Sequence, residues 1–144
     1  MQTIYTVGTT GMTYERFIGL LRMHRIDAII DVRLQTEGPR YRFASGMQIR
    51  DLSYSQGVQY RHELRFAPTA KMLARFRADQ NWNRFVERYR GIAEDRSMMM
   101  VWCRVAGQFD RPCLLGCDKS AAHCHRRLLA LAIRSAIGSK VSHL

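Results

Sequence analysis

Residues 114–129 read LLGCDKSAAHCHRRLL and gather several reactive side chains around one predicted junction. The leading apolar residues predict the end of a strand, and a polar segment follows. Ser120 is a favourable N-cap, because its hydroxyl accepts from the free N–H groups of a first helical turn. Apolar residues recur at helical spacing from Cys124 onward, which predicts a helix with Cys124 on its apolar face. The stretch thus predicts strand, loop and helix, with Cys117 and Asp118 at the junction.

The N-terminal part of the chain predicts a βαβ unit. Residues 3–7 (TIYTV) are β-branched and aromatic, as is typical of a strand. Thr13 is placed to cap a helix whose apolar residues begin at Phe17. Residues 28–32 (AIIDV) form an almost continuous apolar run, which favours a strand buried on both faces of a parallel sheet.

The remaining pattern continues the alternation of strands and helices. The expected helices cover residues 47–54, part of 66–81, 82–93 and the segment after Ser120; the expected strands cover residues 58–61, 98–103, 113–116 and 140–144. Such alternation predicts an α/β fold: a three-layer, mainly parallel sheet flanked by helices, Rossmann-like, in a single domain over residues 1–144.

Polar residues follow several of the expected strands. In parallel α/β sheets, ligands bind beyond the carboxyl ends of the strands, so these clusters are expected to meet at one edge. The clusters are Gly8, Thr9 and Thr10; Asp31 and Arg33; His62 and Glu63; and Cys117 and Asp118.

Composition narrows the class of partner. The chain has a formal net charge of +11 over 144 residues, and arginine supplies nearly all of the positive charge. The planar guanidinium suits phosphate and carboxylate groups, which favours an anionic partner. No apolar run approaches the roughly 20 residues of a membrane span. The N-terminus does not resemble a signal peptide, so a cytoplasmic location with reduced thiols is expected.

Six stretches share a further pattern: TVGTTGMTYERFIGLL, IIDVR, the region around Phe43, GVQYRHEL, CDKSAAHCHRRLLA and VSHL. Together they resemble a known family, Domain of Unknown Function 488. The resemblance implies an α/β domain whose polar motifs line one site, and it implies no particular reaction. The chain differs from the usual family pattern at Thr9, Arg65 and Asp118, and its longer segment 98–112 predicts an added hairpin near residues 98–116.

These observations predict a site that binds a phosphate-bearing or nucleotide-like ligand. A stronger form of the hypothesis is that the protein also hydrolyses or transfers this ligand. Arg33 and Arg126 are expected to contact the anion. Cys117 is the candidate nucleophile, on the expectation that a nearby helix N-terminus lowers its pKa. The other candidate catalytic residues are Asp31, His62 and Asp118; the other candidate ligand-binding residues are Gly8, Thr9, Thr10, Glu63 and His125.

Two alternatives remain open, a non-catalytic nucleic-acid-binding module and a Cys/His metal protein. The cofactor and the oligomeric state stay open. A phosphatase-type loop is excluded, because no arginine lies six positions after Cys113, Cys117 or Cys124. The nucleic-acid hypothesis uses Arg33, Arg40, Arg42, Arg61 and Arg65 with Tyr41, Phe43, Tyr60 and Phe66; the metal hypothesis uses Cys103, Cys113, Cys117, His123, Cys124 and His125.

Overall fold

Five parallel strands form the centre of the computed structural model, which describes residues 1–144 except for the side chain of Arg40. The strand order is β3-β2-β4-β1-β5, and every neighbouring pair is parallel. The strands are β1 (Thr3–Gly8), β2 (Ala28–Asp31), β3 (Gln59–His62), β4 (Pro112–Gly116) and β5 (Lys140–His143). The α-helices are α1 (Tyr14–Met23), α2 (Gly46–Ser55), α3 (Ala70–Asp79), α4 (Trp82–Asp95), α5 (Met98–Ala106) and α6 (His125–Ile137), with short 3-10 helices η1 (Pro39–Ala44) and η2 (Leu64–Phe66).

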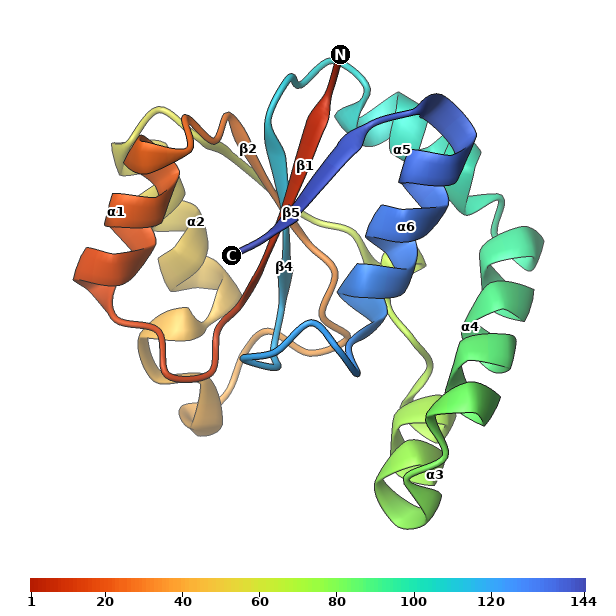
Figure 1. Ribbon diagram of the computed structural model, residues 1–144. Coiled ribbons are helices and arrows are strands. Elements are labelled where there is room, and N and C mark those ends of the chain that lie inside the picture. The colour runs from red at the N-terminus through yellow and green to blue at the C-terminus, as the bar shows by residue number, and fades with distance from the viewer.

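Helices cover both faces of the sheet, which confirms the predicted three-layer α/β fold. Figure 1 shows α1 and α2 on one side and α4, α5 and α6 on the other. Alternate strand residues enter two separate cores, because successive side chains point to opposite faces. Ile29 packs in the core that contains Phe17 of α1, whereas Ile30 packs in the core that contains Trp102 of α5. The fully buried β2 explains its continuous apolar run.

Helix α5 corrects the prediction of a strand over residues 98–103 and of an added hairpin near residues 98–116. Those residues contain a helix, a short connection and β4. The buried residues Met98, Val101, Trp102 and Val105 recur at helical spacing, a signal that extends beyond the apolar run. The Trp102 ring lies 6.0 Å from that of Phe66, and its Nε1 donates to Gln2. The short apolar run of residues 98–103 is compatible with either a strand or a helix, and tertiary packing determines that it is a helix.

Helix α6 begins later than predicted, and Ser120 is not its N-cap. The helix starts at His125 with Cys124 as N-cap, so the prediction of Cys124 inside the helix was also wrong, although the residue is buried. Ser120 instead accepts a hydrogen bond from the amide of Ala122 in a local turn. The Arg126 guanidinium binds carbonyl oxygens of the preceding loop, so the loop backbone is satisfied without becoming helical.

None of the described helices combines the length and the apolar character that crossing a bilayer requires.

Helix α3 lies beyond the carboxyl edge of the sheet, at the bottom of Figure 1. The segment from α3 to α4 therefore places a helix beyond the carboxyl ends of the strands.

Candidate functional site

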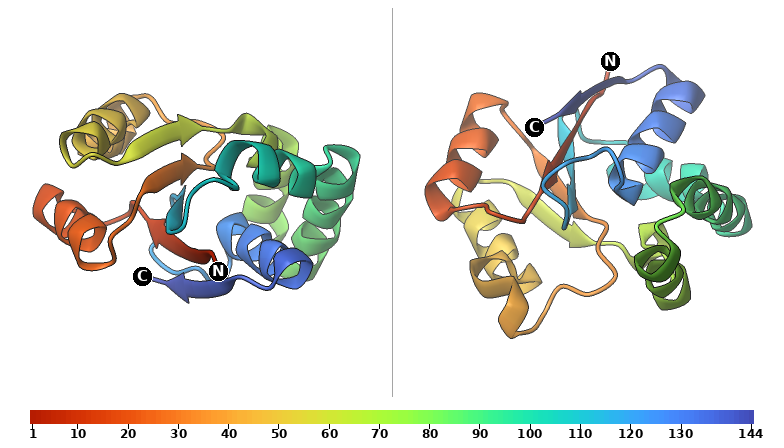
Figure 2. Two further views of the ribbon diagram at one scale, coloured as in Figure 1. Left: turned by 90° about the horizontal axis from the view of Figure 1, so that it is seen from above. Right: turned by 60° about the horizontal axis from the view of Figure 1, so that its bottom comes forward.

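A pocket of about 790 Å³ lies at the carboxyl edge of the sheet, within the size range of small-molecule sites. The right-hand view of Figure 2 turns this edge toward the reader. The segment after β1 and the loop after β4 line the pocket on the sheet side, and the 41–44 segment lines another part of it. Helix α3 supplies Leu73, Phe76, Arg77 and Gln80, and α4 supplies Phe85.

The predicted site residues divide into two groups. The edge location follows from the all-parallel sheet, but only some of the clustered side chains reach the pocket. Those that line it are Thr9, Thr10, Arg33, Cys117, Asp118 and His125. Those that lie outside its lining are Gly8, Asp31, His62, Glu63 and Arg126.

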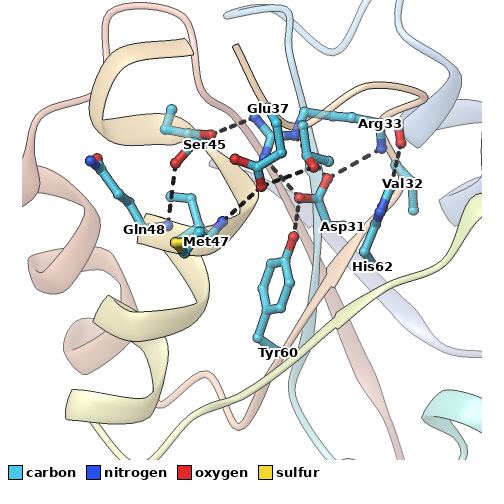
Figure 3. A network of polar contacts seen from close by, with 12 residues as sticks. Asp31, Val32, Arg33, Glu37, Ser45, Met47, Gln48, Tyr60 and His62 are labelled. Atoms are coloured by element: carbon cyan, nitrogen blue, oxygen red, sulfur yellow. Dashed lines mark hydrogen bonds and ion pairs between the residues drawn. The ribbon is translucent and has the colours of Figure 1, made fainter. Parts of the chain in front are cut away.

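Asp31 and Arg33 form a buried ion pair at the end of β2 (Figure 3). Arg33 Nε and Nη2 donate to the two carboxylate oxygens of Asp31 at 2.8 and 2.7 Å, and both side chains are fully buried. The Tyr60 hydroxyl donates to Asp31 at 2.6 Å, while Arg33 Nη1 donates to the carbonyl of Ala44 at 2.7 Å. Burial and then the Asp31 charge raise the pKa of Tyr60. Within this network Asp31 binds Arg33 and Tyr60. Arg33 also connects β2 to the 41–44 segment through its hydrogen bond to Ala44.

Two histidines hold the backbone that follows β2. His62 Nε2 lies 2.7 Å from the carbonyl oxygen of Arg33, and His125 Nε2 lies 2.7 Å from that of Val32. A carbonyl oxygen only accepts, so each imidazole donates from Nε2. Burial lowers the pKa of His125 to about 4, which keeps this ring neutral at pH 7. His125 thus joins α6 to β2 from the wall of the pocket.

The buried neutral state of His125 makes the stability of the protein depend on pH. An unfolded histidine binds a proton below about pH 6.5, whereas the folded His125 stays neutral until about pH 4. Lowering the pH therefore favours the unfolded state, and stability is lost from about pH 6.5 toward pH 4. Between pH 7.5 and 5 we expect the free energy of unfolding to fall by about 2 kcal/mol more in the natural protein than in His125→Gln. Urea denaturation at both pH values measures this difference, and equal losses in the two proteins would contradict it.

Arg126 and Gly8 shape the loop that follows β4. Arg126 is fully buried and donates to the carbonyl oxygens of Asp118 at 2.7 Å and Lys119 at 3.4 Å. Thr10 Oγ1 donates to the carbonyl of Cys117 at 2.6 Å. A Cβ atom on Gly8 would lie 1.6 Å from the Asp118 carbonyl oxygen. The loop therefore sits directly on the backbone of β1, and the fixed position of its pocket-lining residues depends on that contact.

The environment of Cys117 differs from the predicted one. The thiol follows β4 directly, but the N-cap of α6 is seven residues further on, at Cys124. Burial raises the pKa of the Cys117 thiol, and the positive charge of Arg33 opposes this only in part. The expected lowering of its pKa by a helix N-terminus was therefore wrong. Burial likewise raises the pKa of Cys124, the second thiol of the pocket.

Several arginines of the nucleic-acid hypothesis are already engaged. Arg33 binds Asp31, and Arg65 and Arg61 pair with Glu63 at 2.7 and 3.4 Å. Hydrogen bonds from Arg65 hold the pKa of Glu63 below its usual range. Arg42 lines the pocket, and the side chain of Arg40 lies outside the described part of the structure.

An aromatic cluster on α3 and α4 forms the wall that the sequence predictions missed. The Phe76 ring lies 5.6 Å from both Trp82 and Phe85, and the Trp82 and Phe85 rings stack at 5.1 Å. His123 lies 5.1 Å from Trp82 and also lines the pocket. Phe76 and Phe85 lie in segments whose apolar residues recur at helical spacing, which is also the signature of an ordinary core. Their position beyond the strand ends turns part of that face toward the pocket.

The metal hypothesis receives no support from the arrangement of its ligands. Among the described side chains, no group of three or more His, Cys, Asp or Glu is placed to hold a metal ion. Cys103 is exposed on α5, and Cys113 is buried within β4. His125 Nε2 is occupied by the carbonyl of Val32.

Comparison with known proteins identifies the family. The family model described as "Domain of unknown function DUF488" matches residues 13–133, so the chain belongs to this family. No curated protein and no solved structure gave a match. The match spans elements from α1 to α6 and includes most of the residues that line the pocket.

Proposed function

We propose that this member of the DUF488 family binds a phosphate-bearing, nucleotide-like small molecule in the pocket at the carboxyl edge of its sheet. The observation that carries the proposal is the presence of aromatic rings and arginines in one pocket. Phe76 and His123 offer ring surfaces against which a base can pack, whereas the Phe85 ring is buried and stacks against Trp82 and Tyr89. Arg42 and Arg77 lie on the same lining and offer positive charge to a phosphate.

The position of the pocket supports the same class of ligand. Ligands of open parallel α/β sheets bind beyond the carboxyl ends of the strands. The net charge of +11 likewise favours an anion. Asp118 is a carboxylate on this lining, and its negative charge disfavours anions close to it. The phosphate is therefore expected nearer to the arginines than to Asp118.

Hydrolysis or transfer of the ligand would use the candidate catalytic residues that line the pocket, Cys117 and Asp118. The raised pKa of Cys117 keeps its thiol neutral at pH 7, which weakens it as a nucleophile. Binding is therefore the first activity to measure, and catalysis is a second question for any ligand found.

Titration calorimetry with a panel of nucleoside monophosphates, the matching nucleosides and inorganic phosphate tests the proposal. We expect at least one nucleotide to bind at least 10-fold tighter than its nucleoside or phosphate alone. Phe76→Ala should weaken that binding about 10-fold, since base stacking contributes about 1–3 kcal/mol. Met100→Ala is the matched control, because Met100 is an exposed apolar side chain of α5 outside the pocket lining. If none of the nucleotides binds at millimolar concentration, the proposal is wrong.

Oligonucleotide titrations separate this proposal from the nucleic-acid-binding alternative. A single-stranded binding module predicts an affinity that falls steeply with salt, because each neutralised phosphate releases condensed counterions. A single-nucleotide pocket predicts a shallow salt dependence and no gain in affinity with strand length. Tight, length-dependent and salt-sensitive binding would favour the alternative.

A further inference from the structure

We infer that Arg42 is the residue that contacts the anionic group of the ligand, in place of Arg33 and Arg126. The inference rests on the proposed function and specifies the part of the pocket that receives the negative charge. Arg42 belongs to η1, lines the pocket and is exposed. Three observations carry the inference: the engagement of the buried arginines, the availability of the Arg42 guanidinium and the backbone conformation at this position.

The two buried arginines are already engaged with the protein. The Arg33 side chain is fully buried and binds the Asp31 carboxylate and the Ala44 carbonyl. Arg126 is fully buried and binds the carbonyls of Asp118 and Lys119. Contact with a ligand would require Arg33 to leave the buried Asp31 carboxylate, and Arg126 to leave the loop carbonyls that it binds while itself buried, which is costly. Their contribution to an anion is therefore confined to the long-range field of their charge.

In contrast to the guanidinium groups of Arg33 and Arg126, the Arg42 guanidinium is available to bind a ligand. Within the described part of the structure it makes neither an ion pair nor a hydrogen bond. The same holds for Arg77 on α3, the other exposed arginine of the pocket. A guanidinium presents a planar set of N–H donors that matches two oxygens of a phosphate at once. Arg42 and Arg77 can both attract an anion, but they differ in backbone conformation.

Arg42 has a backbone conformation that side chains other than glycine rarely adopt. Its φ is 49° and its ψ is −127°, which interrupts the 3-10 geometry of η1. Non-glycine residues persist in such conformations only where the surroundings impose them, and such residues cluster at ligand sites. Arg77 lies in the regular last turn of α3 and carries no such feature. The strained backbone therefore distinguishes Arg42 from Arg77 as the residue that contacts the anion.

Hydrogen bonds from neighbouring residues hold the backbone on both sides of Arg42. In the orientation that its neighbours favour, the Gln48 amide donates to the carbonyl oxygens of Arg42 and Phe43 at 3.2 and 2.8 Å. Arg33 donates to Ala44, and the amide of Gly46 donates to the carbonyl of Thr36 at 2.9 Å. These contacts fix the backbone beside Arg42, so this part of the pocket wall is formed before any ligand arrives.

Two substitutions at this position test the inference with the nucleotide found by calorimetry. Arg42→Gln removes the charge and keeps a Cβ in the strained conformation, whereas Arg42→Gly removes both the charge and the strain. We expect both variants to bind the nucleotide at least 10-fold more weakly and to bind the matching nucleoside as the natural protein does. We also expect Arg42→Gly to melt at a higher temperature than Arg42→Gln. Arg134→Gln is the matched control, because Arg134 is an exposed arginine in the last turn of α6, outside the pocket lining.

The outcomes separate this inference from the proposed function. If the natural protein binds the nucleotide and Arg42→Gln binds it equally well, the inference is wrong while the proposed function stands. An equal loss of nucleotide and nucleoside binding would show that Arg42 only supports the structure, and it also overturns the inference. A natural protein that binds neither nucleotide nor phosphate removes both. Arg42→Gly melting below Arg42→Gln would contradict the imposed strain on which the inference depends.

Discussion

Gly8→Ala should destabilise the protein by more than about 3 kcal/mol, at the upper end of overpacking effects. The added methyl would lie 1.6 Å from the carbonyl oxygen of Asp118, and the obstructing atom is backbone. The strand and the loop must separate, which breaks the hydrogen bonds from Thr9 to Gly116 and from Thr10 to Cys117. Chemical denaturation monitored by circular dichroism measures the loss.

Gly91→Ala is the matched control for the same chemical change. A Cβ on Gly91 meets no atom within 4 Å, and the residue lies inside α4. Alanine is the better helix former, so this variant should be more stable than the natural protein by about 0.5–1 kcal/mol. A Gly8→Ala protein that unfolds at the same urea concentration as Gly91→Ala would disprove the close approach of β1 and the loop after β4.

Arg33→Met should cost about 3–5 kcal/mol, the usual effect of removing one partner of a buried ion pair. The variant leaves the fully buried Asp31 carboxylate without its guanidinium partner, and the Tyr60 hydroxyl alone does not neutralise it. It also leaves the carbonyl of Ala44 without the donor that joins the 41–44 segment to β2. Denaturant midpoints at pH 7 report the loss.

Two further variants distinguish charge burial from lost packing. Combining Arg33→Met with Asp31→Asn removes the isolated buried charge, so the double variant should be more stable than Arg33→Met alone. Arg50→Met removes the arginine of an exposed pair, in which both side chains are about half exposed or more, and should leave the midpoint unchanged. If Arg33→Met behaves like Arg50→Met, the ion pair has no structural role.

The sequence predicted that the polar clusters lie at the carboxyl edge of the sheet, but it did not predict which partners their side chains bind, and the roles assigned to these residues stay predictions. The sequence located the polar clusters at the carboxyl edge, because strand ends follow from apolar runs and their polar breaks. It could not show that Asp31 would bind Arg33, or that Arg126 would bind backbone carbonyls, because those partners are decided by packing. It named Arg42 only as one of five arginines in the nucleic-acid hypothesis, because the residue type does not reveal the backbone conformation that distinguishes Arg42 from the others.

The residue pattern is enough to predict the alternation of strands and helices, the buried strand β2 and the edge where the polar residues meet. These features are encoded locally, in periodic burial and in capping residues such as Thr13. Three features became evident only in the folded structure. Residues 98–106 are helical, and Cys124 is the N-cap of α6. Helices α3 and α4 supply aromatic side chains to the pocket beyond the strand ends. Those outcomes depend on contacts between segments far apart in the chain, whose energy no local pattern records.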